Sequence, residues 1–73
     1  MLPVFLIVPT EKYFYGNALV AADNKEEAET LYKAKSDYNA YLFEEGNCEV
    51  KELKDLFFDE NVQKVLIDTI NSE

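Results

Sequence analysis

The sequence predicts an α+β protein in which a mixed β-sheet is covered on one face by a helix. One observation is the apolar run from Leu2 to Pro9, which is rich in β-branched and aromatic residues and too short for a buried helix. Another is a helical spacing of apolar residues after a capping residue, Asp23 or Asn24. With 73 residues the chain has room for a single domain, 1–73, with the expected element order β-β-α-β-β.

The first strand is expected over residues 4–8, because proline cannot donate to a strand ladder and Pro3 and Pro9 bound this range. Gly16-Asn17 tolerates positive φ and predicts a tight reversal. We therefore expect a second strand over 18–22, antiparallel to the first.

The main helix is expected to begin at Lys25. Glu26 and Glu27 then lie favourably against the positive end of the helix dipole. The stripe that faces the sheet consists of Ala28, Leu31 and Tyr32.

A second, shorter helix is expected over 37–45, with Ser36 as its N-cap and Gly46 at its end. Its apolar side consists of Tyr38, Tyr41 and Leu42.

Residues 47–53 alternate between apolar and charged side chains. Cys48 and Val50 share one face, while Glu49 and Lys51 share the other. This pattern predicts a half-exposed strand at an edge of the sheet.

The tail fits two structures. Residues 64–70 are rich in valine, isoleucine and threonine, which favours a strand, while an apolar stripe and a possible N-cap at Asp59 favour a helix. We expect the strand, because the sheet needs partners for its edges.

The charge of the chain restricts its partners. Fifteen acidic residues against seven lysines give a net charge of −8, which repels nucleic acid and anionic membranes and favours a protein partner with a basic surface. The apolar start is far shorter than the ~20 residues of a membrane span. One cysteine and no histidine exclude an internal disulfide and a cysteine-histidine zinc site. We expect a cytoplasmic protein without metal or cofactor.

The residues for catalysis are also missing. A serine or cysteine nucleophile usually needs a histidine base, and two glycines cannot build a phosphate-binding loop. We interpret Cys48 as a buried apolar residue and the carboxylate pairs Glu44-Glu45 and Asp59-Glu60 as solvated charges. No catalytic residue is assigned, and we expect a non-enzymatic protein.

Two aromatic segments are candidates for binding. In Tyr13-Phe14-Tyr15, strand alternation directs at least one ring away from the core, although core packing is an equal alternative. Leu56-Phe57-Phe58 is expected in a loop, either closing the core or exposed between acidic residues.

The first strand is apolar on both faces, whereas one helical layer covers only one face of a sheet. The short second helix, a second copy of the chain or a target protein are the alternatives for the other face.

Several segments resemble small, mostly uncharacterised proteins from phages and bacterial genomes. They are Phe5-Leu6-Ile7-Val8, the helix start from Ala22 to Ala28 and the strand from Val65 to Ile70. The resemblance implies the ββαββ fold and a phage or mobile-element origin, and it brings no catalytic residue.

Charge and resemblance together predict an inhibitor, of the anti-CRISPR kind, that occupies the nucleic-acid-binding surface of a bacterial defence nuclease. Carboxylates stand in for phosphates and aromatic rings supply apolar anchorage. The expected partner-binding residues are Tyr13, Phe14, Tyr15, Glu44, Glu45, Glu49, Glu52, Asp55, Phe57, Asp59 and Glu60. The alternative is a structural or regulatory homo-oligomer that uses its uncovered sheet face or an edge strand.

Overall fold

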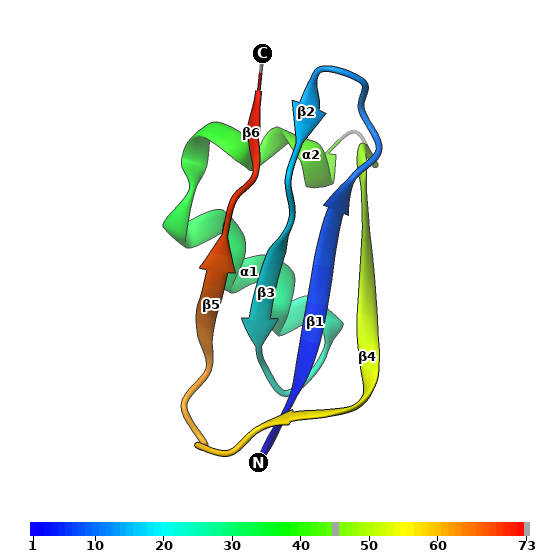
Figure 1. Ribbon diagram of the computed structural model, residues 1–73. Helices are drawn as coiled ribbons and strands as arrows, with labels where there is room; N and C mark the ends of the chain where they lie inside the picture. Colours follow the sequence, from blue (N-terminus) through cyan, green and yellow to red (C-terminus); the bar gives the residue numbers. More distant parts are fainter. Residues whose placement is uncertain (45, 73) are drawn as a thin grey trace.

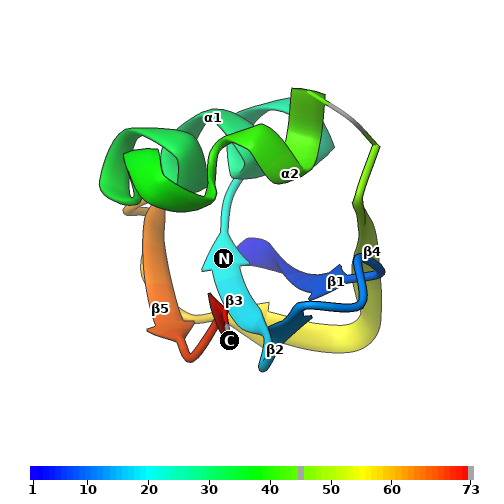
Figure 2. The ribbon, with the colours of Figure 1, turned by 90° about the horizontal axis from the view of Figure 1, so that it is seen from above.

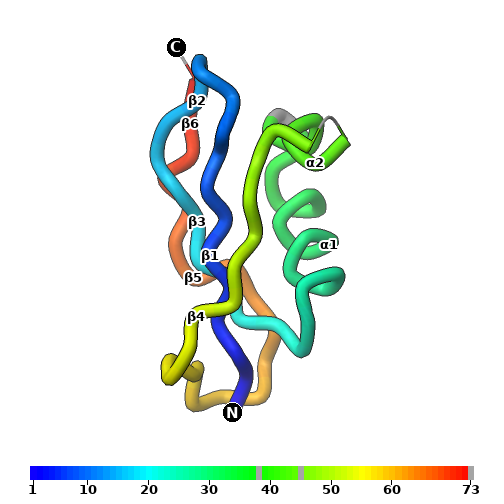
Figure 3. The backbone as a smooth tube through the Cα atoms, turned by 90° about the vertical axis from the view of Figure 1, so that its right-hand side faces the viewer, coloured from blue at the N-terminus to red at the C-terminus, as the bar shows by residue number. Residues whose placement is uncertain are grey.

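A computed structural model of the protein describes residues 1–44 and 46–72, and the side chain of Tyr38 lies outside the described part. The elements are β1 Leu2–Pro9, β2 Phe14–Tyr15, β3 Ala18–Ala21, α1 Lys25–Lys35, the 3-10 turn η1 Asp37–Asn39, α2 Tyr41–Glu44, β4 Cys48–Phe58, β5 Lys64–Asp68 and β6 Asn71–Ser72. The helices lie on one side of the strands (Figure 1, Figure 3), which confirms the predicted α+β class. The expected order β-β-α-β-β is incomplete, because it lacks the short strands β2 and β6.

The four longer strands lie in the order β4-β1-β3-β5, and every neighbouring pair is antiparallel. The predicted mixed sheet is therefore wrong. Helix α1 returns the chain to the end of the sheet where β1 finishes, and β4 then pairs with the free side of β1 (Figure 1). Strands β3 and β4 run in the same direction, but β1 separates them.

The reversal after β1 comes earlier in the chain than predicted. The amide of Phe14 donates to the carbonyl of Glu11 at 3.1 Å, so the turn precedes Gly16-Asn17. Gly16 instead lies between β2 and β3 with φ at 87°, where an added Cβ would collide with the carbonyl of Thr69. Glycine is needed here for the close approach of two backbone segments as well as for the positive φ.

Helix α1 begins as the sequence predicts. Of the two possible caps, Asn24 acts: its Oδ1 accepts from the Glu27 amide at 2.9 Å. Ala28 and Tyr32 are buried against the sheet. No helix in the described ranges is long and apolar enough to cross a membrane.

The predicted second helix is shorter and broken into η1 and α2. Ser36 makes no side-chain cap; its amide instead donates to the carbonyl of Tyr32 at 3.0 Å, which ends α1. Leu42 is buried and Tyr41 is exposed, so the expected apolar side is reduced. Gly46 has φ at 67°, as expected of a residue that follows a helix.

Strand β4 is longer than predicted and includes Leu56-Phe57-Phe58, so the loop expected there is wrong. Phe58 pairs with Leu2 and Phe57 with Pro3, so β4 pairs with β1 from the first residue of β1 to the last, with one irregularity. The expected edge position is confirmed, because β4 pairs only with β1 in the described sheet.

The tail forms a strand, as expected, over Lys64–Asp68. Leu19 pairs with Ile67 and Val20 with Val65 across a small irregularity. The helical alternative with Asp59 as N-cap is excluded, because this segment fills the free side of β3.

The main core lies between the sheet and the helices. It consists of Phe5, Ile7, Ala18, Val20, Ala22, Ala28, Tyr32, Leu42 and Ile70. Alanines on β3 and α1 allow the helix to approach closely, and the large Tyr32 side chain fills the remaining space.

A buried polar network ties the helices to β5. The Tyr32 hydroxyl donates to Asp68 Oδ1 at 3.1 Å, and the Asn39 amide donates to the Tyr32 hydroxyl at 3.0 Å. Desolvation by burial, with a smaller contribution from Asp68, raises the pKa of Tyr32 to about 12.

The opposite side of the sheet is partly covered by the chain itself. The second half of β4 and the connection 59–63 pass beneath the strands on the side away from the helices (Figure 2, Figure 3). The amide of Asp23 donates to Gln63 Oε1 at 2.8 Å, which holds this connection against the sheet. Val4 and Ala21 are buried outside the main core, consistent with this second cover.

Candidate functional site

The surroundings of Cys48 disfavour its thiolate, which is the nucleophilic form. Its thiol is half-buried between β4 and α1, and burial, with a smaller contribution from Glu29, raises its pKa. A protonated thiol reacts slowly near neutral pH. Within residues 1–44 and 46–72, no group of three or more histidine, cysteine, aspartate or glutamate side chains is placed to hold a metal ion.

A bulge divides β4 into two halves. Phe5 pairs with Glu52, whereas Pro3 pairs with Phe57, so β4 contains extra residues between these pairs. Asp55 lies in the bulge with φ at 62°, a conformation that disfavours a residue with a Cβ by about 1 kcal/mol or more.

The bulge changes the direction of the side chains that follow it. Phe57 is 53% exposed and Leu56 is also exposed, although both belong to a paired strand. Bulges are common where a strand redirects a side chain toward a ligand or partner.

Four carboxylates flank these apolar side chains in the sequence. Glu52 and Asp55 precede Phe57, while Asp59 and Glu60 follow it, and all four are exposed. None of them forms an ion pair within the part of the chain that the structure describes. We call residues 52–60 the acidic segment.

Four lysines contact aromatic rings or a carboxylate. Their ammonium groups lie over aromatic rings at 5.0 to 5.5 Å, in the pairs Lys12-Tyr13, Lys33-Phe43 and Lys64-Phe58. Lys51 pairs with Glu49 at 3.3 Å. The acidic segment itself contains four carboxylates and one lysine, Lys54, and the Lys64 ammonium group lies over its Phe58 ring, so its charge remains negative overall.

The three aromatic residues of the segment Tyr13-Phe14-Tyr15 differ in their exposure. Tyr13 and Tyr15 are 55% and 54% exposed, whereas Phe14 turns inward and meets the Tyr41 ring edge-on at 5.3 Å. Phe14 is therefore a packing residue, and two of the three rings remain available at the surface.

The predicted binding residues do not form one surface. Tyr13 and Tyr15 lie where β1 ends, and the acidic segment lies toward the opposite end of a molecule that is 34 Å long (Figure 1). Glu44 is exposed at the end of α2, and Glu45 lies outside the described residues. Glu49 is exposed on the first half of β4 in its pair with Lys51.

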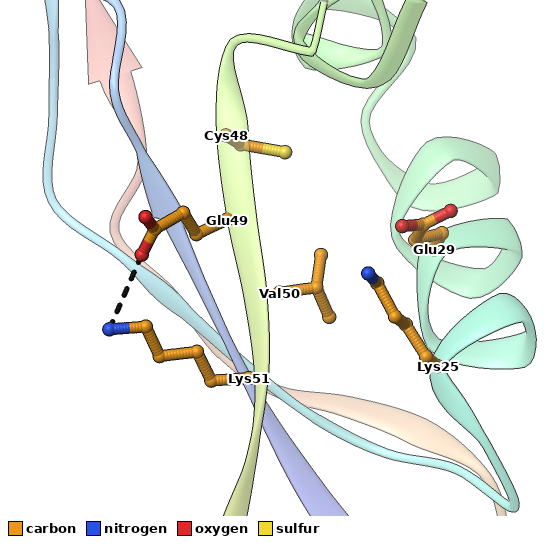
Figure 4. Close-up of a pocket in the computed structure, with 6 residues that line it drawn as sticks. All are labelled: Lys25, Glu29, Cys48, Glu49, Val50 and Lys51. Carbon is orange, nitrogen blue, oxygen red and sulfur yellow. Dashed lines mark ion pairs between the residues drawn. The ribbon is translucent and has the colours of Figure 1, made fainter.

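A groove between α1 and β4 was not predicted. It has a volume of about 380 Å³ and is lined by Lys25, Glu29, Cys48, Glu49, Val50 and Lys51. Cys48 and Val50 point toward α1, while Glu49 and Lys51 point away from it (Figure 4). Two sequence signals could have predicted this groove. One is the spacing of Lys25 and Glu29 on one side of a helix, and the other is the alternation of residues 48–51.

Comparison with known proteins gives no relatives: no family model, no curated protein and no solved structure matches the chain.

Proposed function

We propose that the protein is a non-enzymatic acidic binding protein whose acidic segment occupies a basic, nucleic-acid-binding surface of another protein. The observation that carries the proposal is the bulge at Asp55, after which Phe57 is exposed, flanked in the sequence by four exposed carboxylates that form no ion pair within the described residues.

The charge supports a partner rich in lysine and arginine. The chain carries a net charge of −8, and Glu52, Asp55, Asp59 and Glu60 concentrate negative charge on one segment. A protein surface that binds phosphates attracts such a segment at long range and holds it through charge-assisted hydrogen bonds.

Phe57 supplies the apolar part of the contact. Charged pairs at the rim of an interface contribute modestly to affinity, whereas a buried aromatic anchor often contributes most. An exposed phenylalanine in a segment rich in carboxylates fits a partner pocket that is apolar at its centre and basic at its rim.

The partner class that we propose is a nuclease or another nucleic-acid-binding protein of a bacterial defence system. This part of the proposal follows the resemblance to small phage proteins and makes the protein an inhibitor of the anti-CRISPR kind. It acts by occupying the nucleic-acid site and needs no catalytic residue.

The test is an affinity capture from bacterial lysate with three versions of the tagged protein. One is the native chain, one carries Asp55→Asn, Asp59→Asn and Glu60→Gln, and the control carries Glu26→Gln, Glu27→Gln and Asp37→Asn. Both variants lose three negative charges, and all six positions are exposed.

The native chain and the control are expected to retain the same nucleic-acid-binding protein at about 50 mM salt and to lose it at about 500 mM, because screening weakens the contact. The acidic-segment variant should retain much less, and added DNA should displace the partner. Equal retention by both variants, or retention that salt and DNA do not change, would contradict the proposal.

A further inference from the structure

The first half of β4 is an open strand edge. The amide of Thr10 donates to the carbonyl of Asn47 at 2.8 Å, and antiparallel pairing then alternates inward and outward peptide groups along β4. The peptide groups of Glu49 and Lys51 turn to β1. Those of Cys48, Val50 and Glu52 turn outward, where β4 has no neighbouring strand in the described sheet.

The charged side chains along this edge form a pattern that is complementary to its own reverse. Glu49 and Lys51 stand on the face away from the helices at equal distances along the strand from Val50, and the Val50 side chain points into the groove beside α1 (Figure 4). A twofold rotation about Val50 therefore exchanges a negative position with a positive one.

We infer that two copies of the chain associate by antiparallel pairing of their β4 edges about a twofold axis at Val50. Val50 then lies opposite Val50 of the second copy, with outward peptide groups facing each other. Glu49 of each copy lies opposite Lys51 of the other. The two sheets become one continuous sheet, and both α1 helices lie on the same face of it.

Charge selects this register. When the axis moves by one residue in either direction, Glu49 faces Glu49 or Lys51 faces Lys51, and like charges directly opposite each other are destabilising. Only the register centred on Val50 brings opposite charges together along the regular part of the strand.

The rest of the edge limits the pairing to a short segment. The bulge with Asp55 interrupts β4 after its regular first half, and a bulge blocks continued strand pairing. Two chains with a net charge of −8 also repel each other at long range. We expect a weak dimer with a Kd of about 1 to 100 µM, which tightens as salt rises.

The groove beside β4 fits this arrangement. In a single copy it is an open space of about 380 Å³ flanked by Lys25 and Glu29 of α1. In the twofold pair the two grooves open onto each other, so the apolar side chains of Val50 become shared between two helical layers.

The first experiment is analytical ultracentrifugation of charge-exchange variants. Glu49→Lys alone places two positive charges opposite each other and is expected to weaken the dimer at least about tenfold. This loss is expected even though the substitution makes the net charge of each chain less negative and so reduces the long-range repulsion between the two copies. The double variant Glu49→Lys with Lys51→Glu restores the pattern and should restore the dimer. Glu27→Lys makes the same charge change on α1 outside the groove and should not weaken it.

The second experiment fixes the register with disulfides. Directly opposed residues of a hydrogen-bonded antiparallel pair have Cα atoms about 5.5 Å apart, within disulfide range. Under mild oxidation, Val50→Cys in a Cys48→Ser background should give a covalent dimer, and so should Glu52→Cys with the native Cys48. The native chain should not, since Cys48 lies opposite Glu52.

Three results would overturn the inference. One is a single-chain mass for the native protein up to about 1 mM. Another is rapid cross-linking through Cys48 alone, which requires a different register. The third is a dimer that is insensitive to Glu49→Lys but lost on Ile67→Lys, which would place the contact on the uncovered sheet face.

Discussion

The two faces of β1 meet different surroundings, although both are apolar in sequence. Phe5 and Ile7 face the helices and are fully or almost fully buried. Leu6 and Val8 face the other side and are only partly buried. One side is closed by α1 and α2, and the other is covered only toward the end where β1 begins, by β4 and the connection 59–63 (Figure 3).

The partial cover leaves an apolar row across the sheet. Leu6 pairs with Leu19 and Leu19 with Ile67, so these three side chains lie next to one another on three strands. Ile67 is 50% exposed. The comparison indicates that the helical side supplies most of the stability and that the other side is available for contacts.

The strongest test of this comparison removes core volume on the helical side. Ile7→Ala leaves a cavity in a fully buried position and is expected to lower the free energy of unfolding by about 2 to 5 kcal/mol. Leu6→Ala, the neighbour on the other face, should lower it by about half as much or less. Urea denaturation of both variants measures the difference, and equal losses would show that both faces are closed.

The next test uses the titration of Tyr32. Below its ordinary pKa of 10.0 the side chain is neutral in both states, and the native pKa is about 12. Between about pH 10 and pH 12 the unfolded chain ionises while the native one does not, so roughly 2 kcal/mol of stability should be lost.

Tyr32→Phe is the matched variant, because it keeps the ring and removes the ionisable group. Its stability at pH 8 should be lower, since Asp68 and Asn39 lose a buried partner. Its slope of stability against pH above 10 should be shallower than that of the native protein. Identical slopes would mean that Tyr32 titrates normally.

The elements on the helical side were largely predictable from local signals. The Asn24 cap, the Ala28 and Tyr32 stripe and the β-branched strand at 64–68 each follow from short stretches of sequence. The fully antiparallel pairing of the four longer strands was not predictable, because it depends on which side of β1 the chain reaches after α1.

The candidate sites were predictable only in part. The exposure of Phe57 depends on a bulge, which arises from the pairing of β4 with β1 and leaves no local signal in Leu56-Phe57-Phe58. Phe14 is partly buried and its neighbour Tyr15 is exposed, because Phe14 packs against the main core and the Tyr41 ring, and these contacts come from distant parts of the chain.

A smaller effect on stability is expected at the bulge of β4, after which the chain crosses the face of the sheet opposite the helices. Asp55→Gly relieves the positive φ and should raise the free energy of unfolding by about 0.5 to 1 kcal/mol. Asp59→Gly, an exposed position without positive φ, should not stabilise the chain. Thermal denaturation distinguishes them, and a destabilised Asp55→Gly variant would show that the carboxylate itself holds the bulge.

The smallest effect is expected on the open row itself. Ile67→Thr keeps a β-branched side chain suited to a strand and removes apolar surface that is already half in water, so the free energy of unfolding should change by about 0.5 kcal/mol or less. Val65→Thr, on the same strand but packed against the core, should lower it by about 1 to 2 kcal/mol. Measurement at low protein concentration separates folding from association, because a monomer gains nothing from a second copy. A loss at Ile67 as large as that at Val65 would mean that the far face is as tightly packed as the helical one, and the division between a stabilising face and an available face would then be wrong.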